Sequence, residues 1–107
     1  MDKELLLKVL ELAVKGEAKS NDLPFEIGKC YFIRTATLYC TGRVKAITGK
    51  FITLEDGAWI ADTGRFHEFI SSGLANEIEP VKCLMYVNTD SVCDAFQWEH
   101  KLPREVK

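Results

Sequence analysis

The sequence lacks the features that mark membrane, secreted and nucleic-acid-binding proteins. No run approaches the roughly 20 consecutive apolar residues of a membrane-spanning helix, and the N-terminal leucines are interrupted by Lys8, Glu11 and Lys15. No small-residue cleavage site follows them, so a signal peptide is not expected. The 14 basic and 16 acidic residues give a net charge of −2, which offers no attraction to nucleic acid or to anionic membranes. The sequence therefore predicts a cytoplasmic protein with neither a membrane nor a nucleic acid as partner.

Motifs for metals and cofactors are missing as well. The sequence contains no phosphate loop and no Rossmann or Ser-x-x-Lys signature. The four cysteines include no C-x-x-C pair, and the two histidines lack a ligand spacing, so we expect no metal and no cofactor. In a cytoplasmic protein, free cysteines are expected to be small buried apolar residues. They are Cys30, Cys40, Cys83 and Cys93.

The residues that are present describe one globular domain over 1–107, of α+β type and mainly β. Apolar residues make up 47% and charged residues 28% of the chain, as in an ordinary folded protein. The pattern predicts an amphipathic helix over 2–15, a connector over 16–29, a β-rich part over 30–98 and a tail over 99–107 that is either poorly ordered or on the surface. The expected fold is a helix followed by a small, partly open antiparallel barrel of about six strands, with a helical insertion at 63–73.

The predicted N-terminal helix is apolar over more of its surface than packing on one sheet requires. One interpretation buries this helix deeply in its own domain. The other packs it against a second copy of the chain, which makes the protein a homo-oligomer. The interface residues expected in that case are Leu5, Leu6, Val9, Leu10 and Ala13.

Turn residues divide the β-rich part. Cys30–Cys40 is predicted to be one extended stretch, followed by interruptions at Thr41–Gly42 and Gly49. Asp56–Gly57 is predicted to form a hairpin turn, because Asp-Gly between apolar strands is a strong two-residue turn signal. Residues 83–88 and 92–98 are predicted to pair as a final hairpin around Thr89–Asp90.

Asp62-Thr63-Gly64 is the one string that could identify an enzyme. Preceded by Trp59-Ile60-Ala61, it resembles the catalytic loop of retroviral-type aspartic proteases, whose chemistry needs two aspartates that share a proton. That family follows its glycine with a small residue, whereas Arg65 stands here, and its later apolar-Gly-Arg segment is missing. A helix cap by Asp62 or Thr63 is the alternative, and we expect no enzyme.

Arg34 provides the candidate ligand site. In a regular strand it shares a face with Phe32, so it needs a carboxylate, a backbone carbonyl or an anionic ligand as its partner. A structural ion pair is one interpretation. The other is an anion-binding site near the start of the second helix. The residues expected to hold a nucleotide-like ligand there are Arg34, Trp59, Arg65 and His67.

Two resemblances add context. The segment 42–56 resembles a hairpin of Sm-like or SH3-like barrels, a likeness that concerns fold rather than function. Further segments resemble small proteins encoded by tailed phages and prophages. The segments that carry this second resemblance are 31–35, 41–43, 54–56, 59–66, 79–80 and 102–104. This resemblance implies a non-enzymatic phage accessory protein. Such a protein either counters host defence by binding a nucleotide-like ligand or a host factor, or forms part of the virion head or neck.

Changing both Leu6 and Leu10 to aspartate is expected to convert an oligomer into a folded monomer, because charge placed at an apolar contact costs several kcal/mol. Light scattering on the full chain, at roughly tens of micromolar protein, measures the mass. A wild-type chain that is already monomeric at that concentration contradicts an interface formed by this helix.

Overall fold

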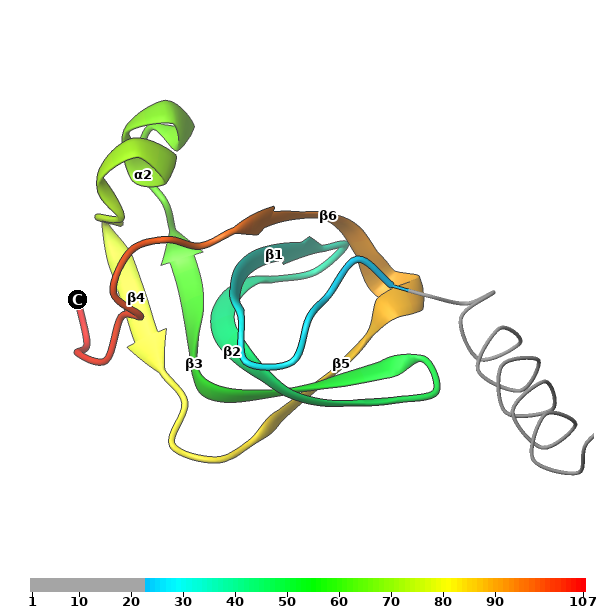
Figure 1. Ribbon diagram of the computed structural model, residues 1–107. Coiled ribbons are helices and arrows are strands. Elements are labelled where there is room, and N and C mark those ends of the chain that lie inside the picture. Colours follow the sequence, from blue (N-terminus) through cyan, green and yellow to red (C-terminus); the bar gives the residue numbers. More distant parts are fainter. Residues whose placement is uncertain (1–22) are drawn as a thin grey trace, which may run out of the picture.

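The computed structural model describes residues 23–107, so the helix predicted over 2–15 and its interface residues lie outside the described part. Residues 23–107 form six strands and one short α-helix, whose arrangement is drawn in Figure 1. Within residues 23–107, no helix is both long enough and apolar enough to cross a membrane. The elements are β1 (Cys30–Thr35), β2 (Tyr39–Thr48), β3 (Phe51–Asp62), α2 (Phe66–Ser72), β4 (Glu77–Pro80), β5 (Met85–Asn88), the 3-10 turn η1 (Thr89–Ser91) and β6 (Val92–Gln97).

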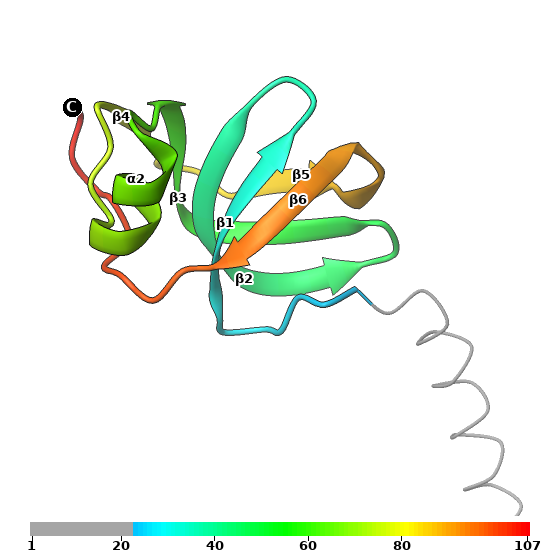
Figure 2. The same ribbon diagram turned by 90° about the horizontal axis from the view of Figure 1, so that it is seen from above.

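All six strands belong to one antiparallel sheet, which confirms the mainly β prediction. The strand order is β4-β3-β2-β1-β6, and β5 pairs with the first part of β3. The sheet curls strongly (Figure 1, Figure 2), but its two ends are not paired with each other. Residues 23–107 therefore form an open, curled sheet, and α2 occupies the middle of the insertion predicted at 63–73.

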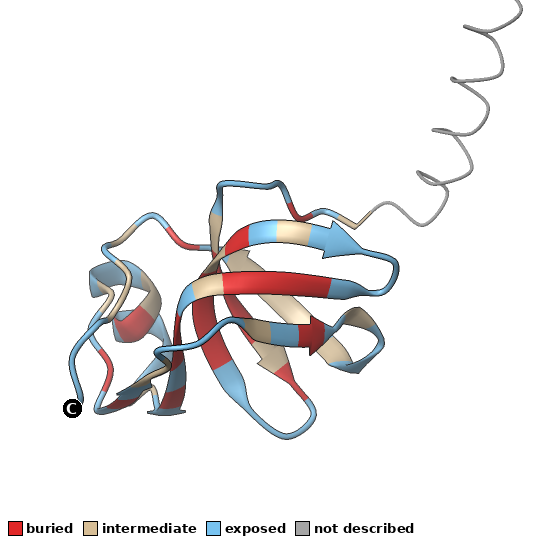
Figure 3. Cartoon of the chain, turned by 90° about the horizontal axis from the view of Figure 1, so that it is seen from below, coloured by how far each residue is buried: buried red, intermediate tan, exposed pale blue. Residues whose placement is uncertain are grey.

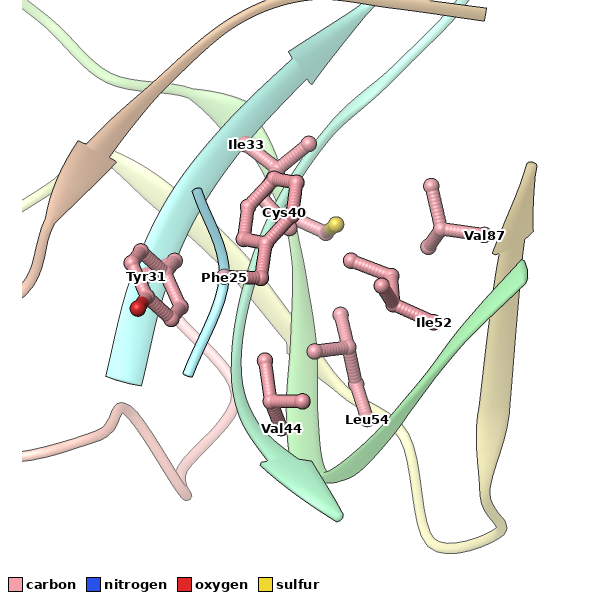
Figure 4. Close-up of a cluster of buried hydrophobic side chains, with 8 residues drawn as sticks. All are labelled: Phe25, Tyr31, Ile33, Cys40, Val44, Ile52, Leu54 and Val87. Carbon is pink, nitrogen blue, oxygen red and sulfur yellow. The ribbon is translucent and has the colours of Figure 1, made fainter. Parts of the chain in front are cut away.

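The concave side of the sheet encloses a first apolar cluster, the inner core (Figure 4). Its side chains come from β1, β2, β3 and β5, and Phe25 from the preceding segment packs against them. Phe25 lies edge-on to Tyr31, with ring centroids 5.0 Å apart, and the Tyr31 hydroxyl accepts the N–H of Glu26 at 2.8 Å. The inner core consists of Phe25, Tyr31, Ile33, Cys40, Val44, Ile52, Leu54 and Val87.

The opposite face of the sheet carries a second cluster, the outer core, to which α2 and the segment after β6 also contribute. Side chains alternate between the two faces of a strand. Tyr31 and Ile33 of β1 therefore enter the inner core, while Phe32 enters the outer core, and all three are buried. Figure 3 shows the buried residues concentrated on the strands and the exposed ones at the turns. The outer core consists of Phe32, Ala58, Ile60, Phe69, Ala75, Ile78 and Trp98.

A bulge in β3 lets this one strand serve both cores. Between two successive pairs with β2, β3 contains one residue more than its partner, and Asp56 at this point has a positive φ of 51°. Arg43 donates a hydrogen bond to Asp56 Oδ2 at 2.8 Å. One additional residue reverses the faces of the residues beyond it. Leu54 consequently faces the inner core, whereas Ala58 and Ile60 face the outer core.

The bulge corrects the predicted hairpin turn at Asp56–Gly57, because β3 continues through both residues. Gly42 does not interrupt the chain either. It lies inside β2, where an added Cβ atom would come within 2.9 Å of Leu54 Cβ, so the glycine permits a close approach of the two strands. The turn predicted at Gly49 is confirmed, with a φ of 58° between β2 and β3.

Two other predicted turns differ. The stretch 30–40 is divided after Thr35, whose hydroxyl accepts the N–H of Leu38 at 3.0 Å and closes a tight turn. The predicted final hairpin is wrong, because η1 separates β5 from β6 and directs them to different neighbours. Asn88 starts this 3-10 turn by accepting the N–H of Asp90 at 3.0 Å. β5 then pairs with β3, and β6 pairs with β1.

The tail over 99–107 lies on the surface and is attached to the sheet. The backbones of Lys107 and Ile78 exchange two hydrogen bonds of 2.9 Å. Arg104 Nη1 donates to the carbonyl of Gly57 at 2.8 Å. Figure 2 shows the tail beside α2 and β4. These three parts of the chain therefore form one side of the molecule.

The cysteines differ in their environment. All four are free, but Cys83 and Cys93 are exposed and Cys30 is half-buried. This corrects the prediction that they are buried apolar residues. Cys40 is buried in the inner core, and burial raises the pKa of its thiol to about 12.

Asp56→Ala and Asp56→Gly form a matched test of the bulge. Both variants lose the carboxylate that binds Arg43, but alanine must also adopt the left-handed conformation, at a cost of about 1 kcal/mol that glycine avoids. We expect the free energy of unfolding of Asp56→Ala to be lower than that of Asp56→Gly by this amount in urea titrations. Equal stability of the two variants contradicts a strained backbone at this position.

Candidate functional site

Arg34 forms an ion pair with Asp94 on the neighbouring strand. The register of β1 and β6 places the two residues opposite one another. Arg34 Nε donates to Asp94 Oδ1 at 2.7 Å and Nη2 donates to Oδ2, so the pair is bidentate. Two parallel hydrogen bonds fix the orientation of both groups. The side chains are 31% and 39% exposed, which places the ion pair at the surface of the molecule. Of the two interpretations of Arg34, this arrangement is the structural ion pair.

Three aromatic rings surround the guanidinium group of Arg34. Its Cζ atom lies 5.0 Å from the ring centroid of Phe66, 5.4 Å from that of Phe96 and 5.8 Å from that of Tyr39. These distances allow cation–π attraction. Phe66 and Tyr39 are each 39% exposed, so aromatic surface surrounds the ion pair on the outside of the molecule. We name this region the Arg34 surface, which consists of Arg34, Leu38, Tyr39, Phe66, Asp94 and Phe96.

The ion pair favours the charged forms of both partners. The hydrogen bond from Arg34 lowers the pKa of Asp94, although burial acts in the opposite direction. The same hydrogen bond raises the pKa of Arg34. Because Asp94 already compensates the charge of Arg34, an anionic ligand at this position has to displace a carboxylate that binds through two hydrogen bonds.

Of the four residues predicted to hold a nucleotide-like ligand, Trp59 lies apart from Arg34. Trp59 pairs with Cys40 in the sheet, whereas Arg34 pairs with Tyr39, the residue before Cys40. Neighbouring residues of a strand face opposite sides of the sheet. Trp59, which is 44% exposed, therefore lies on the face away from Arg34.

Arg65 and His67 are exposed at the start of α2, and they flank Phe66 in the sequence. Phe66 lies over Arg34 and edge-on to Phe96, with ring centroids 5.4 Å apart. Phe66, and not Trp59, is thus an aromatic ring that lies beside Arg34.

Neither Asp62 nor Thr63 caps α2, which corrects the predicted cap. The N-cap residue is Arg65, without a capping hydrogen bond from its side chain. Asp62 ends β3, and its Oδ1 accepts the N–H of Gly64 at 2.8 Å. The backbone N–H of Asn76 donates to the carbonyl of Asp62 at 2.9 Å. Asp62 therefore stabilises the turn at the end of β3. In the described part of the chain, no three His, Cys, Asp or Glu residues are grouped as metal ligands.

Sequence reasoning missed Asp94 and Phe96. Asp94 lies 60 residues after Arg34, and nothing local in the sequence connects the two. The alternation in β6 does place Asp94, Phe96 and Trp98 on one face. The predicted hairpin pairs this strand with residues 83–88. A prediction that paired it with β1 would have placed Asp94 and Phe96 beside Arg34.

Comparison with known proteins gives no match: no protein-family model, no curated protein and no solved structure is similar to this chain. The interpretation of the Arg34 surface therefore depends on its own geometry and chemistry.

Asp94→Asn removes the charge of the ion pair and keeps the size of the side chain. Arg34 lowers the pKa of folded Asp94 below its unfolded value of about 3.9. The pair therefore stabilises the fold above that pH, and this stabilisation is lost as the pH falls through the folded pKa. At about pH 7 we expect the variant to lose up to about 1 kcal/mol, as for a partly exposed pair.

The difference between wild type and Asp94→Asn should shrink as the pH is lowered from about 5 to about 2. Urea titrations at each pH measure it. A difference that stays constant over this range shows that the charge of Asp94 does not contribute.

Proposed function

We propose that the chain is a non-enzymatic binding protein and that its Arg34 surface binds another protein. One arrangement supports this proposal: an ion pair holds an arginine among three aromatic rings, two of which are 39% exposed. Aromatic residues and arginine are enriched at protein–protein interfaces and contribute most of the binding free energy there. Leu38, which is 37% exposed, extends this apolar surface beside Tyr39.

The Arg34 surface is ordered before any partner binds. Pairing of β1 with β2 and β6 fixes Arg34, Tyr39, Asp94 and Phe96 relative to each other, and Phe66 packs on Phe96. Side chains that are already fixed lose little conformational entropy on association. The ion pair carries no net charge, so the expected partner presents apolar and aromatic groups rather than a strong charge.

The resemblance to proteins of tailed phages and prophages supplies the expected partner, which is a host factor involved in defence. A component of the virion head or neck is the alternative partner. The order β6-β1-β2-β3-β5, with a 3-10 turn before β6, is similar to that of SH3-like barrels. It supports a binding role by analogy of fold alone. A nucleotide-like ligand at Arg34 is the second candidate function.

A photo-crosslinking amino acid at position 38 tests the protein partner. In cells that naturally express the gene, we expect one dominant crosslinked protein, identified by mass spectrometry. Phe66→Ala in the same chain should reduce this product about tenfold or more, because it removes an exposed ring from the centre of the surface. The matched control carries the crosslinker at Tyr86, which is 67% exposed on β5 and outside the Arg34 surface.

The proposal is contradicted if the crosslinkers at positions 38 and 86 give the same product in the same amount. It is also contradicted if Phe66→Ala does not reduce the product from position 38. A host protein in the product supports a role against host defence, and a virion protein supports the structural role. Thermal unfolding with cyclic and linear nucleotides tests the second candidate. A rise in melting temperature of roughly ten degrees at a hundredfold excess over Kd, lost in Arg34→Ala, would favour the anionic ligand.

A further inference from the structure

A cleft of about 520 Å³ lies between the end of α2, β4 and the tail. It is lined by residues 72–74, 78 and 100–107. Its volume lies within the range of roughly 300–1,000 Å³ that is usual for small-molecule sites. No residue of the Arg34 surface lines this cleft, so it is a separate region of the molecule.

Hydrogen bonds hold the tail in place as one wall of the cleft. His100 Nε2 lies 2.7 Å from the carbonyl of Ile70, near the end of α2. The indole N–H of Trp98 donates to the carbonyl of Lys101 at 3.2 Å. At the other end, Lys107 and Ile78 exchange two backbone hydrogen bonds. The wall is therefore fixed at both of its ends and is formed before a ligand binds.

The charged residues that line the cleft are mostly cationic. Among the charged side chains of the lining, those of Lys101, Arg104 and Lys107 are cationic and that of Glu105 is anionic. The cations in the four ion pairs of residues 23–107 are Arg34, Arg43 and Lys50, so none of these three cations is neutralised in that way. This excess of positive charge contrasts with the net charge of −2 of the whole chain.

Arg104 is a cation in a fixed position. Its Nη1 donates to the carbonyl of Gly57 at 2.8 Å, and its Nη2 donates to that of Val81 at 3.4 Å. Both partners are neutral carbonyl groups, so neither of them neutralises the positive charge of Arg104. The nearby carboxylates of Glu77 and Glu79 alternate with Ile78 along β4, and they therefore lie on the face of β4 opposite to Ile78.

The cleft also has an apolar part. Leu74 is 67% exposed and Val106 is 81% exposed, and Ile78, Leu102 and Pro103 join them in the lining. A ligand that covers these side chains removes apolar surface from water, which favours binding. Apolar walls beside unneutralised cations match a molecule that has both an apolar body and a negative charge.

We propose that this cleft binds a small organic anion with an apolar body, such as an aryl or alkyl phosphate or carboxylate. The apolar residues bind the body, while Lys101 and Lys107 bind the anionic group, and Arg104 adds positive charge from its fixed position. The site is independent of the protein partner of the Arg34 surface, and either proposal can fail without the other.

Titration of the full chain with phenyl phosphate, followed by ¹H–¹⁵N NMR, tests the site. We expect saturable shifts confined to residues 72–74, 78 and 100–107. Inorganic phosphate lacks the apolar body and phenol lacks the charge, so each should bind at least about tenfold more weakly. If inorganic phosphate binds as tightly as phenyl phosphate, the proposal is overturned, because the apolar residues of the cleft then contribute nothing to binding. The absence of saturable shifts in the cleft overturns it as well.

Charge reversal provides the matched control. The pair Lys101→Glu and Lys107→Glu should weaken phenyl phosphate binding about tenfold, since one exposed ion pair contributes up to about fivefold. Lys29→Glu with Lys45→Glu changes the net charge equally at exposed positions outside the cleft, and it should leave binding within about twofold of wild type. If the two double variants lose phenyl phosphate affinity by the same factor, the proposal is overturned. If the double variant of Lys101 and Lys107 to glutamate perturbs the fold, Lys101→Gln with Lys107→Gln replaces it. This double variant tests the same loss of affinity with a smaller change of charge.

Discussion

The additional residue in β3, at Asp56–Gly57, is the constraint on which the rest of this fold depends. Without it, the two halves of β3 would present their apolar residues to the same face of the sheet, and the outer core would lose its contribution from the second half. The left-handed conformation of Asp56 is unfavourable for a residue with a side chain, and the hydrogen bond from Arg43 offsets part of that cost. The carbonyl of Gly57 accepts hydrogen bonds from the N–H of Val81 and from Arg104, each of 2.8 Å. The bulge is thereby joined to the segment after β4 and to the tail.

Both candidate sites depend on the outer core for their shape. A continuous series of ring contacts runs through it, with centroids between 4.7 Å and 6.0 Å apart. The first ring, that of Phe66, belongs to the Arg34 surface, and the last ring, that of His100, lines the cleft beside the tail. Substitutions inside this core would change both regions, whereas surface substitutions can change one at a time. The rings, in order, are Phe66, Phe96, Phe32, Phe69, Trp98 and His100.

The sequence alone predicts those features of the fold that are caused by residues close together in the chain. The turn at Gly49 and the overall β content could be predicted in this way. Asp56–Gly57 has an equally strong local signal, but the strand continues through it because both of its halves have pairing partners. Trp59 lies beyond the bulge, so its face could not be derived from alternation alone. The need of Arg34 for a partner was also predictable, whereas the partner was not, because long-range pairing decides it.

β1 has β2 and β6 as its neighbours and is buried on both faces, although Arg34 and Asp94 are 60 residues apart in the chain. During synthesis, β1 leaves the ribosome long before its second neighbour exists, and Phe32 stays uncovered until α2 and β6 follow. Contacts so distant in sequence form slowly, because the entropy of loop closure is lost before the contacts are gained. An unpaired apolar strand is also a template for pairing with other chains. The protein is consequently most prone to aggregate while it is being made, and docking of residues 92–97 ends that vulnerable period.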